Sequence, residues 1–220
     1  MNRIKKFFTI KLRYFNDRSY VVSLALAILF FGVSLVINYF ASTYASNHVT
    51  TPVGDIFLSN VPLCSVAGLF VYGSLVFWIF SMLVYLTHLQ KLPFTLKTSA
   101  LFVLIRALFI NLTWIGPFPD ALTIPNSGIF SLVSFRGDLF FSGHTGFPLL
   151  MAFIFWDSKF LRYCFIGWSV FFAAVVLLGH LHYSIDVVSA IFITYTIFHL
   201  SQIILKKDFQ MAKHGMPVGE

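Results

Sequence analysis

The sequence predicts an all-α integral membrane protein, a bundle of six transmembrane helices with both termini in the cytoplasm. Composition is the first reason, because 58% of the residues are hydrophobic and only 10% are charged, whereas soluble domains carry about 25% charged residues. The second reason is that the apolar residues form runs long enough to cross a bilayer as helices. The third is the uneven distribution of the basic residues, which sets the orientation of the chain.

Six apolar segments are expected to span the membrane. They lie at 20–41, 64–86, 98–116, 143–156, 163–181 and 185–205. The first run is too long for the core of a signal peptide, so we expect it to remain in the protein. The spans form one membrane domain, residues 20–205, between a basic N-terminal segment, 1–19, and a C-terminal tail, 206–220.

The basic residues orient this bundle. Of the 15 Lys and Arg, 13 fall in the two tails and in the second and fourth loops. Six spans place these four segments on one side, which the positive-inside rule assigns to the cytoplasm. The net charge of +7 therefore reflects topology and contact with anionic lipid headgroups, and no nucleic-acid partner is expected. The first, third and fifth loops face outward, and the two cysteines fall at opposite faces, so no disulfide is expected.

One polar motif on the outer side opens the fourth span. Ser142 fits a helix N-cap, and Gly143 beside it leaves backbone amides that can bind a phosphate. His144 could donate a proton to a leaving oxygen. Ordinary capping with an interfacial histidine is the alternative interpretation. The fourth span is also short, about 24 Å against about 30 Å of hydrocarbon, so its outer end is expected slightly below the membrane surface.

A second polar motif opens the sixth span. His182 and Asp186 are four residues apart and therefore share one helical face. A carboxylate on one ring nitrogen fixes the tautomer and leaves the other nitrogen free to attack. A purely structural pair is the alternative, but ionisable residues beside apolar spans are costly, which favours function. His180 could join this site, although an interfacial position fits it better, and no metal-ligand spacing stands out.

Arg106 is expected inside the third span, about ten residues from its outer end, where a guanidinium needs an anion such as a phosphate. The alternative is an internal ion pair with Asp138, Asp186 or Asp120.

Together these motifs resemble the sphingomyelin synthase branch of the type-2 phosphatidic acid phosphatase superfamily. That branch carries Gly-Asp-x-x-x-Ser-Gly-His-Thr, present at 137–145, and His-Tyr-x-x-Asp-Val, present at 182–187. The stretch 106–119 resembles a further motif of the branch. The resemblance covers the third to the sixth spans. The plain phosphatase signature is incomplete, because Val176 stands where those enzymes carry an arginine.

The resemblance implies a role for each residue. His182 would be the nucleophile, Asp186 would orient it, and His144 would act as acid and then as base. The residues that would hold the phosphate or the headgroup are Arg106, Asp138, Ser142, Gly143, Thr145 and Tyr183. Asp138 in particular could attract a cationic headgroup. The resemblance implies no metal and no other cofactor.

The implied reaction moves phosphocholine or phosphoethanolamine from a glycerophospholipid to ceramide or a similar lipid alcohol, on the non-cytoplasmic face. A lipid phosphate phosphatase or a phospholipase C-like hydrolase, with water as acceptor, is the enzymatic alternative. A channel, transporter or scaffold is the third possibility, but the spans lack the polar midplane residues that transport requires. The expected partners are membrane lipids, and the sequence leaves open whether the chain forms a homo-oligomer.

Overall fold

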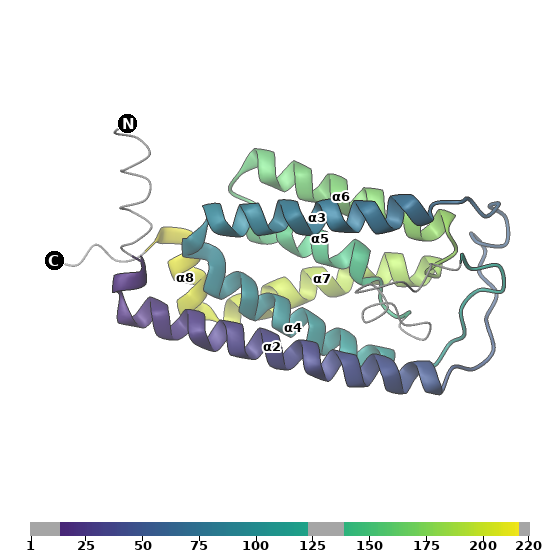
Figure 1. The fold of residues 1–220 in the computed structure, drawn as a ribbon, viewed down its shortest axis with the longest axis horizontal. Coiled ribbons are helices and arrows are strands. Elements are labelled where there is room, and N and C mark those ends of the chain that lie inside the picture. Colours follow the sequence, from purple (N-terminus) through teal and green to yellow (C-terminus); the bar gives the residue numbers. More distant parts are fainter. Residues whose placement is uncertain (1–13, 123–138, 216–220) are drawn as a thin grey trace.

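The computed structural model describes residues 14–122 and 139–215, and the regular elements in these two ranges are helical. Figure 1 shows them as a bundle of roughly parallel and antiparallel rods. Their bounds are α2 (Arg18–Asn47), α3 (Ala67–Thr87), the 3-10 turn η1 (Leu89–Lys91), α4 (Leu92–Ile110), α5 (Gly143–Ile154), α6 (Lys159–Leu178), α7 (Ser184–Ile204) and α8 (Lys206–His214).

Five stretches of the described residues are long and apolar enough to cross a membrane. They are α2, α3, η1 together with α4, α6 and α7. In the most apolar windows of α2, α3, α6 and α7 at most 33% of the residues are buried, and in α2 only 17%, whereas the window in η1 and α4 is 50% buried. Exposed apolar surfaces of this kind are typical of helices in contact with lipid, and the chain fits a multi-pass membrane protein. The fourth expected span, 143–156, corresponds to α5, which has 12 residues, or about 18 Å, too short to cross hydrocarbon alone.

The third span was predicted six residues too late at each end. The prediction was 98–116, whereas α4 covers Leu92–Ile110. Pro93 occupies the first turn of α4, where it starts a helix instead of breaking one. Lys91 and Lys97 also suggested a loop, but in the structure each amino group has an acceptor in another part of the chain. Lys91 Nζ donates to Ile154 O at 2.9 Å and contacts Asp157 Oδ2 at 3.2 Å.

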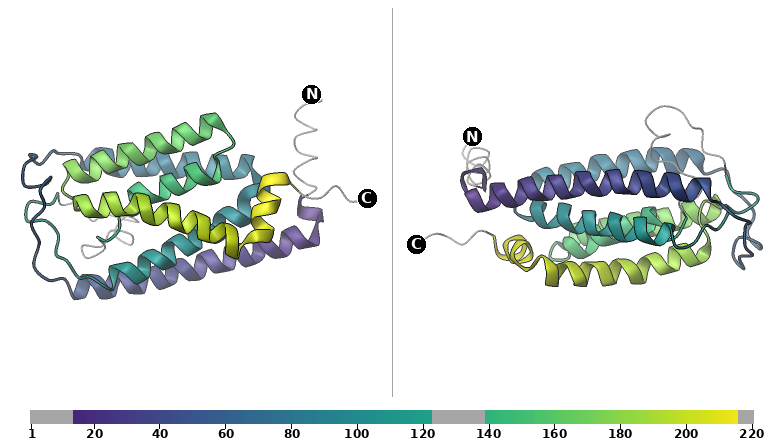
Figure 2. Two further views of the ribbon diagram at one scale, coloured as in Figure 1. Left: turned by 180° about the vertical axis from the view of Figure 1, so that it is seen from behind. Right: turned by 90° about the horizontal axis from the view of Figure 1, so that it is seen from below.

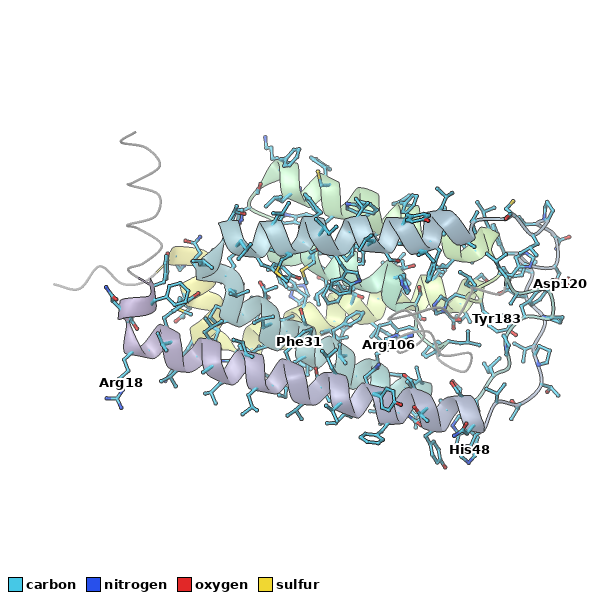
Figure 3. The ribbon with its side chains drawn as sticks, viewed as in Figure 1. Arg18, Phe31, His48, Arg106, Asp120 and Tyr183 are labelled. Carbon is cyan, nitrogen blue, oxygen red and sulfur yellow. The ribbon has the colours of Figure 1, made fainter. Side chains whose placement is uncertain are left out.

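The bundle has two distinct ends. At the tail end α2 begins and α8 lies; at the loop end lie the connections 48–66, 111–122 and 179–183 (Figures 1 and 2). Figure 3 places Arg18 at the tail end and His48, Tyr183 and Asp120 at the loop end. Apart from Arg106, the Lys and Arg residues in the described ranges belong to the tail end. The C-terminal tail that was predicted at 206–220 begins with the helix α8.

Buried polar contacts bind α8 to the bundle at the tail end. Asp208 forms an ion pair with Lys97 of α4, with 2.6 Å between Nζ and Oδ2, and accepts a hydrogen bond from Ser23 of α2. Lys97 Nζ also donates to Ser23 Oγ at 2.9 Å. The ion pair therefore satisfies two charges that would be costly to bury separately.

α5 lies at the centre of the bundle, against α4, α6 and α7. Most of its residues are buried. Gly146 permits this close packing, because a Cβ there would lie 2.7 Å from Thr194 Oγ1 of α7 and 3.0 Å from the Phe102 ring of α4. The small residue therefore sets how closely α5 approaches its neighbours.

The loop end is held together by hydrogen bonds between distant segments. Thr50 N donates to Trp114 O at 2.8 Å, which joins the first connection to the stretch after α4. The Tyr183 hydroxyl donates to Gly116 O at 2.7 Å and accepts from Val53 N at 3.2 Å. These bonds fix the first connection over the start of α7.

Candidate active site

The His182–Asp186 pair lies at the start of α7, at the loop end. Nδ1 of His182 and Oδ2 of Asp186 are 3.4 Å apart, and the two residues are 7% and 1% exposed. Asp186 Oδ2 also accepts from Tyr183 N at 2.9 Å, so the carboxylate is held by the first turn of its own helix. An ionised carboxylate can only accept, which assigns the Nδ1 proton to His182 and leaves Nε2 with its lone pair.

The first motif meets the second through the backbone. Ser142 N donates to Asp186 O at 3.0 Å, which brings the start of α5 against the first turn of α7. Ser142 is fully buried and caps α5, its hydroxyl accepting from Thr145 N at 3.3 Å. Thr145 O in turn accepts from Ser169 Oγ of α6 at 2.8 Å. The helix start that carries His144 is therefore anchored to both α6 and α7.

Arg106 packs over the start of α5. Its Nε donates to Phe141 O at 2.9 Å, and a Cβ at position 143 would lie 3.1 Å from that nitrogen. Gly143 therefore lets the guanidinium approach the α5 amides closely. Arg106 is four residues from the end of α4 at Ile110, not ten as predicted, and Figure 3 shows it projecting into the bundle near the loop end. The guanidinium thus lies next to the predicted phosphate site.

His144 is half-buried between two phenylalanine rings. Its ring centroid lies 4.4 Å from that of Phe70 in α3 and 5.5 Å from that of Phe172 in α6. These neighbours escaped the sequence analysis, because a phenylalanine beside a catalytic histidine looks like any other lipid-facing or packing phenylalanine. They restrict the positions that the His144 ring can adopt.

Asp138 and Tyr183 were both predicted to contact the phosphate or the headgroup of the substrate. Asp138 lies outside the described residues. Tyr183 is 2% exposed, and its hydroxyl bonds to two loop backbone groups. Its contact with a substrate therefore stays a prediction, and its observed contacts are with the protein.

Asp55 was missed by the sequence analysis. Its Oδ2 accepts from Ser184 N at 2.7 Å and from Ser184 Oγ at 2.8 Å, at the first residue of α7. Its Oδ1 accepts from Phe57 N at 2.8 Å and Leu58 N at 3.0 Å. Burial raises the pKa of Asp55, but these hydrogen bonds outweigh it and hold the pKa below its ordinary value. The one available signal was a lone acidic residue in a segment predicted to face outward, 43–62, without other Asp, Glu, Lys or Arg.

A cavity of about 640 Å³ lies at the loop end, lined by segments 58–63 and 118–121 and by His180. His180 is 4% exposed, with Nε2 3.1 Å from Val61 O and its ring against Phe118. It is therefore buried under the first connection. Within residues 14–122 and 139–215, no three His, Cys, Asp or Glu side chains are grouped to hold a metal ion.

A comparison with known protein families finds a match for the part of the chain that carries these motifs. Residues 137–203 match the model of the family described as PAP2 superfamily C-terminal. The matched segment contains His144, His182 and Asp186, but not Arg106 or Asp55. This match supports the type-2 phosphatidic acid phosphatase superfamily, whose members are generally phosphatase-type enzymes. No curated protein and no solved structure matches the chain.

Proposed function

We propose that the protein is a metal-independent lipid phosphotransferase of sphingomyelin-synthase type. It would transfer phosphocholine or phosphoethanolamine from a glycerophospholipid to ceramide or a similar lipid alcohol. The observation that carries this proposal is the hydrogen bond from Ser142 N to Asp186 O. It joins the helix start bearing His144 to the His182–Asp186 pair, and Arg106 contacts the same helix start through Phe141 O.

The first half-reaction forms a covalent intermediate. The Nε2 lone pair of His182 attacks the phosphorus, and the bond from phosphorus to the diacylglycerol oxygen breaks. Protonated His144 gives its proton to that oxygen, so diacylglycerol leaves as a neutral alcohol. Asp186 stabilises the positive charge that develops on the His182 ring. The product is a phosphohistidine that carries the headgroup.

The second half-reaction returns the enzyme to its starting state. Neutral His144 removes the proton of the acceptor hydroxyl, whose oxygen attacks the phosphorus. The bond from phosphorus to Nε2 breaks, and His182 recovers its lone pair. In both steps Arg106 and the amides at the start of α5 stabilise the negative charge on the phosphate oxygens.

Hydrolysis is the second candidate, and the family match favours it, because enzymes of that superfamily are generally phosphatase-type. Water would replace the lipid alcohol in the second half-reaction. The two functions share the phosphohistidine and differ only in the acceptor.

Lipid mass spectrometry separates these functions. The purified protein would be given phosphatidylcholine, phosphatidylethanolamine, phosphatidic acid and ceramide. We expect a ceramide phospholipid and diacylglycerol from the wild type, and neither from His182→Ala. His199→Ala, which changes an exposed histidine near the other end of α7, is the control and should keep activity. Diacylglycerol with only free phosphate or free phosphoalcohol would establish hydrolysis, and no turnover of any lipid would refute both functions.

A further inference from the structure

Two carboxylates from distant parts of the chain share the start of α7. The first N–H groups of a helix have no partner within the helix. Tyr183 N is satisfied by Asp186 Oδ2 at 2.9 Å, from within the helix. Ser184 N and Ser184 Oγ are satisfied by Asp55 Oδ2 at 2.7 and 2.8 Å, from the first connection. Each carboxylate therefore serves a different donor at the same helix start.

Asp55 is itself held rigidly. Its second oxygen accepts from the backbone of Phe57 and Leu58, and the residue is 8% exposed. The connection that carries it is fixed to the rest of the loop end through Val53 N on the Tyr183 hydroxyl. With four donors on its two oxygens, Asp55 is suited to holding protein groups rather than a substrate.

Without this carboxylate the Ser184 donors would lose their acceptor in a poorly exposed place. An asparagine has only one acceptor oxygen and could not serve both Ser184 and the amides of Phe57 and Leu58. Asp186 carries another carboxylate at the same helix start and could turn toward the Ser184 donors. Its contact with His182 Nδ1 is 3.4 Å long, longer than its 2.9 Å bond to Tyr183 N. The contact with the histidine would therefore be lost first.

We propose that Asp55 is a positioning residue for the reaction: by occupying the donors of Ser184, it keeps the Asp186 carboxylate directed at the nucleophile His182. This inference rests on the proposed function for its kinetic consequence, but its structural consequence can be measured without turnover. Asp55 acts through Asp186 and does not contact the phosphate. Its loss should therefore lower kcat and leave KM unchanged.

A double-mutant cycle tests the coupling between the two carboxylates. We expect Asp55→Asn to lower kcat by roughly tenfold, as small misplacements of a reacting group do, with KM unchanged. In an Asp186→Asn background the same change should have less than about a threefold effect, because the route through Asp186 is already lost. Asp120→Asn, an exposed acid at the same end of the bundle, is the control. Equal effects in both backgrounds would overturn the proposal.

A spectroscopic measurement distinguishes this proposal from a general structural role of Asp55. It also does not depend on the proposed function. In protein labelled with ¹⁵N-histidine, the His182 signals are identified by their absence from His182→Ala. Asp55→Asn should shift the ring-nitrogen signals of His182 toward the other tautomer, and Asp120→Asn should not. Unchanged His182 signals would overturn the proposal, whether or not the wild type turns over lipid. If Asp55→Asn is not monodisperse, Asp55→Glu replaces it, because it keeps the charge but displaces it by one methylene.

Discussion

Asp186 uses one oxygen for two partners, since Oδ2 faces His182 Nδ1 and also accepts from Tyr183 N. An Asn at this position can keep the bond to Tyr183 N through its amide oxygen but loses the charge. We therefore predict that Asp186→Asn folds normally and that activity falls by roughly 10²-fold. This is less than the loss of about 10⁴ for the analogous change in serine proteases, because a histidine that attacks directly needs one proton transfer fewer.

Size-exclusion behaviour and thermal stability in detergent would report the fold of this variant, and single-turnover headgroup release its chemistry. Near-normal release would reduce Asp186 to a helix cap without a part in the reaction.

Asp55 should make the fold sensitive to acid. Its pKa lies below the ordinary value, so its ionised form is favoured in the folded protein. The resulting stabilisation is complete above about pH 4, where the carboxyl is ionised even in an unfolded chain. It is lost as the pH falls through the lower pKa of the folded state.

Thermal unfolding in detergent between pH 7 and pH 3 tests this contribution. The Tm of the wild type should fall more steeply below about pH 4 than that of Asp55→Asn. Parallel curves would show that Asp55 contributes no pH-dependent stability.

At the residue scale, the two motifs were predictable because each is contiguous in sequence, so that helix geometry alone places His182 near Asp186. Asp55 was not predictable, because its partner Ser184 is 129 positions away along the chain. Such a contact depends on how the loops cross, which hydrophobic periodicity does not encode.

Among the helices, α5 depends most on close packing. A methyl group at Gly146 would meet the side chains of Thr194 in α7 and Phe102 in α4, so Gly146→Ala must displace them. We predict a loss of about 1–3 kcal/mol in the free energy of unfolding, as for other overpacked sites. Gly167 lies in α6, and a methyl group there would have no atom within 4 Å, so Gly167→Ala should be neutral or stabilising by about 0.5–1 kcal/mol.

Reversible unfolding in detergent would compare the two variants. Equal stabilities would show that the contact between α5 and α7 can relax without loss.

The order of the apolar segments followed from hydropathy, but their ends did not, and five of the predicted six are long enough in the described residues to cross a membrane. The start of α4 was misplaced because Lys91 and Lys97 suggested a loop. In the structure Lys91 is buried and Lys97 partly buried, and each has an acceptor in another element. α8 was not predicted either, because its attachment depends on Asp208 reaching Lys97 and Ser23. A charge with a tertiary partner cannot be distinguished by sequence from one exposed to water.

For the whole molecule, the positive-inside rule predicts that the tail end faces the cytoplasm and the loop end faces outward. The two native cysteines are free thiols and would first be replaced by serine. Ile56→Cys, at a loop-end position 85% exposed, should react with a membrane-impermeant maleimide added from outside. Lys159→Cys, at the exposed start of α6, should react only after the membrane is permeabilised. The opposite pattern would place the candidate site on the cytoplasmic face.

The short length of α5 has a consequence for the fate of the proposed intermediate. α5 is about 12 Å shorter than the hydrocarbon layer is thick. At its tail end, Lys91 binds both Ile154 O and Asp157. If this charged pair lies at the membrane surface, as such pairs favour, the missing length falls at the end that carries His144. A phosphohistidine formed there would lie below the headgroup layer, where water is scarce and a lipid acceptor is already within the bilayer. Competition between the two acceptors would then follow their local concentrations, and a thinner bilayer would favour hydrolysis over transfer.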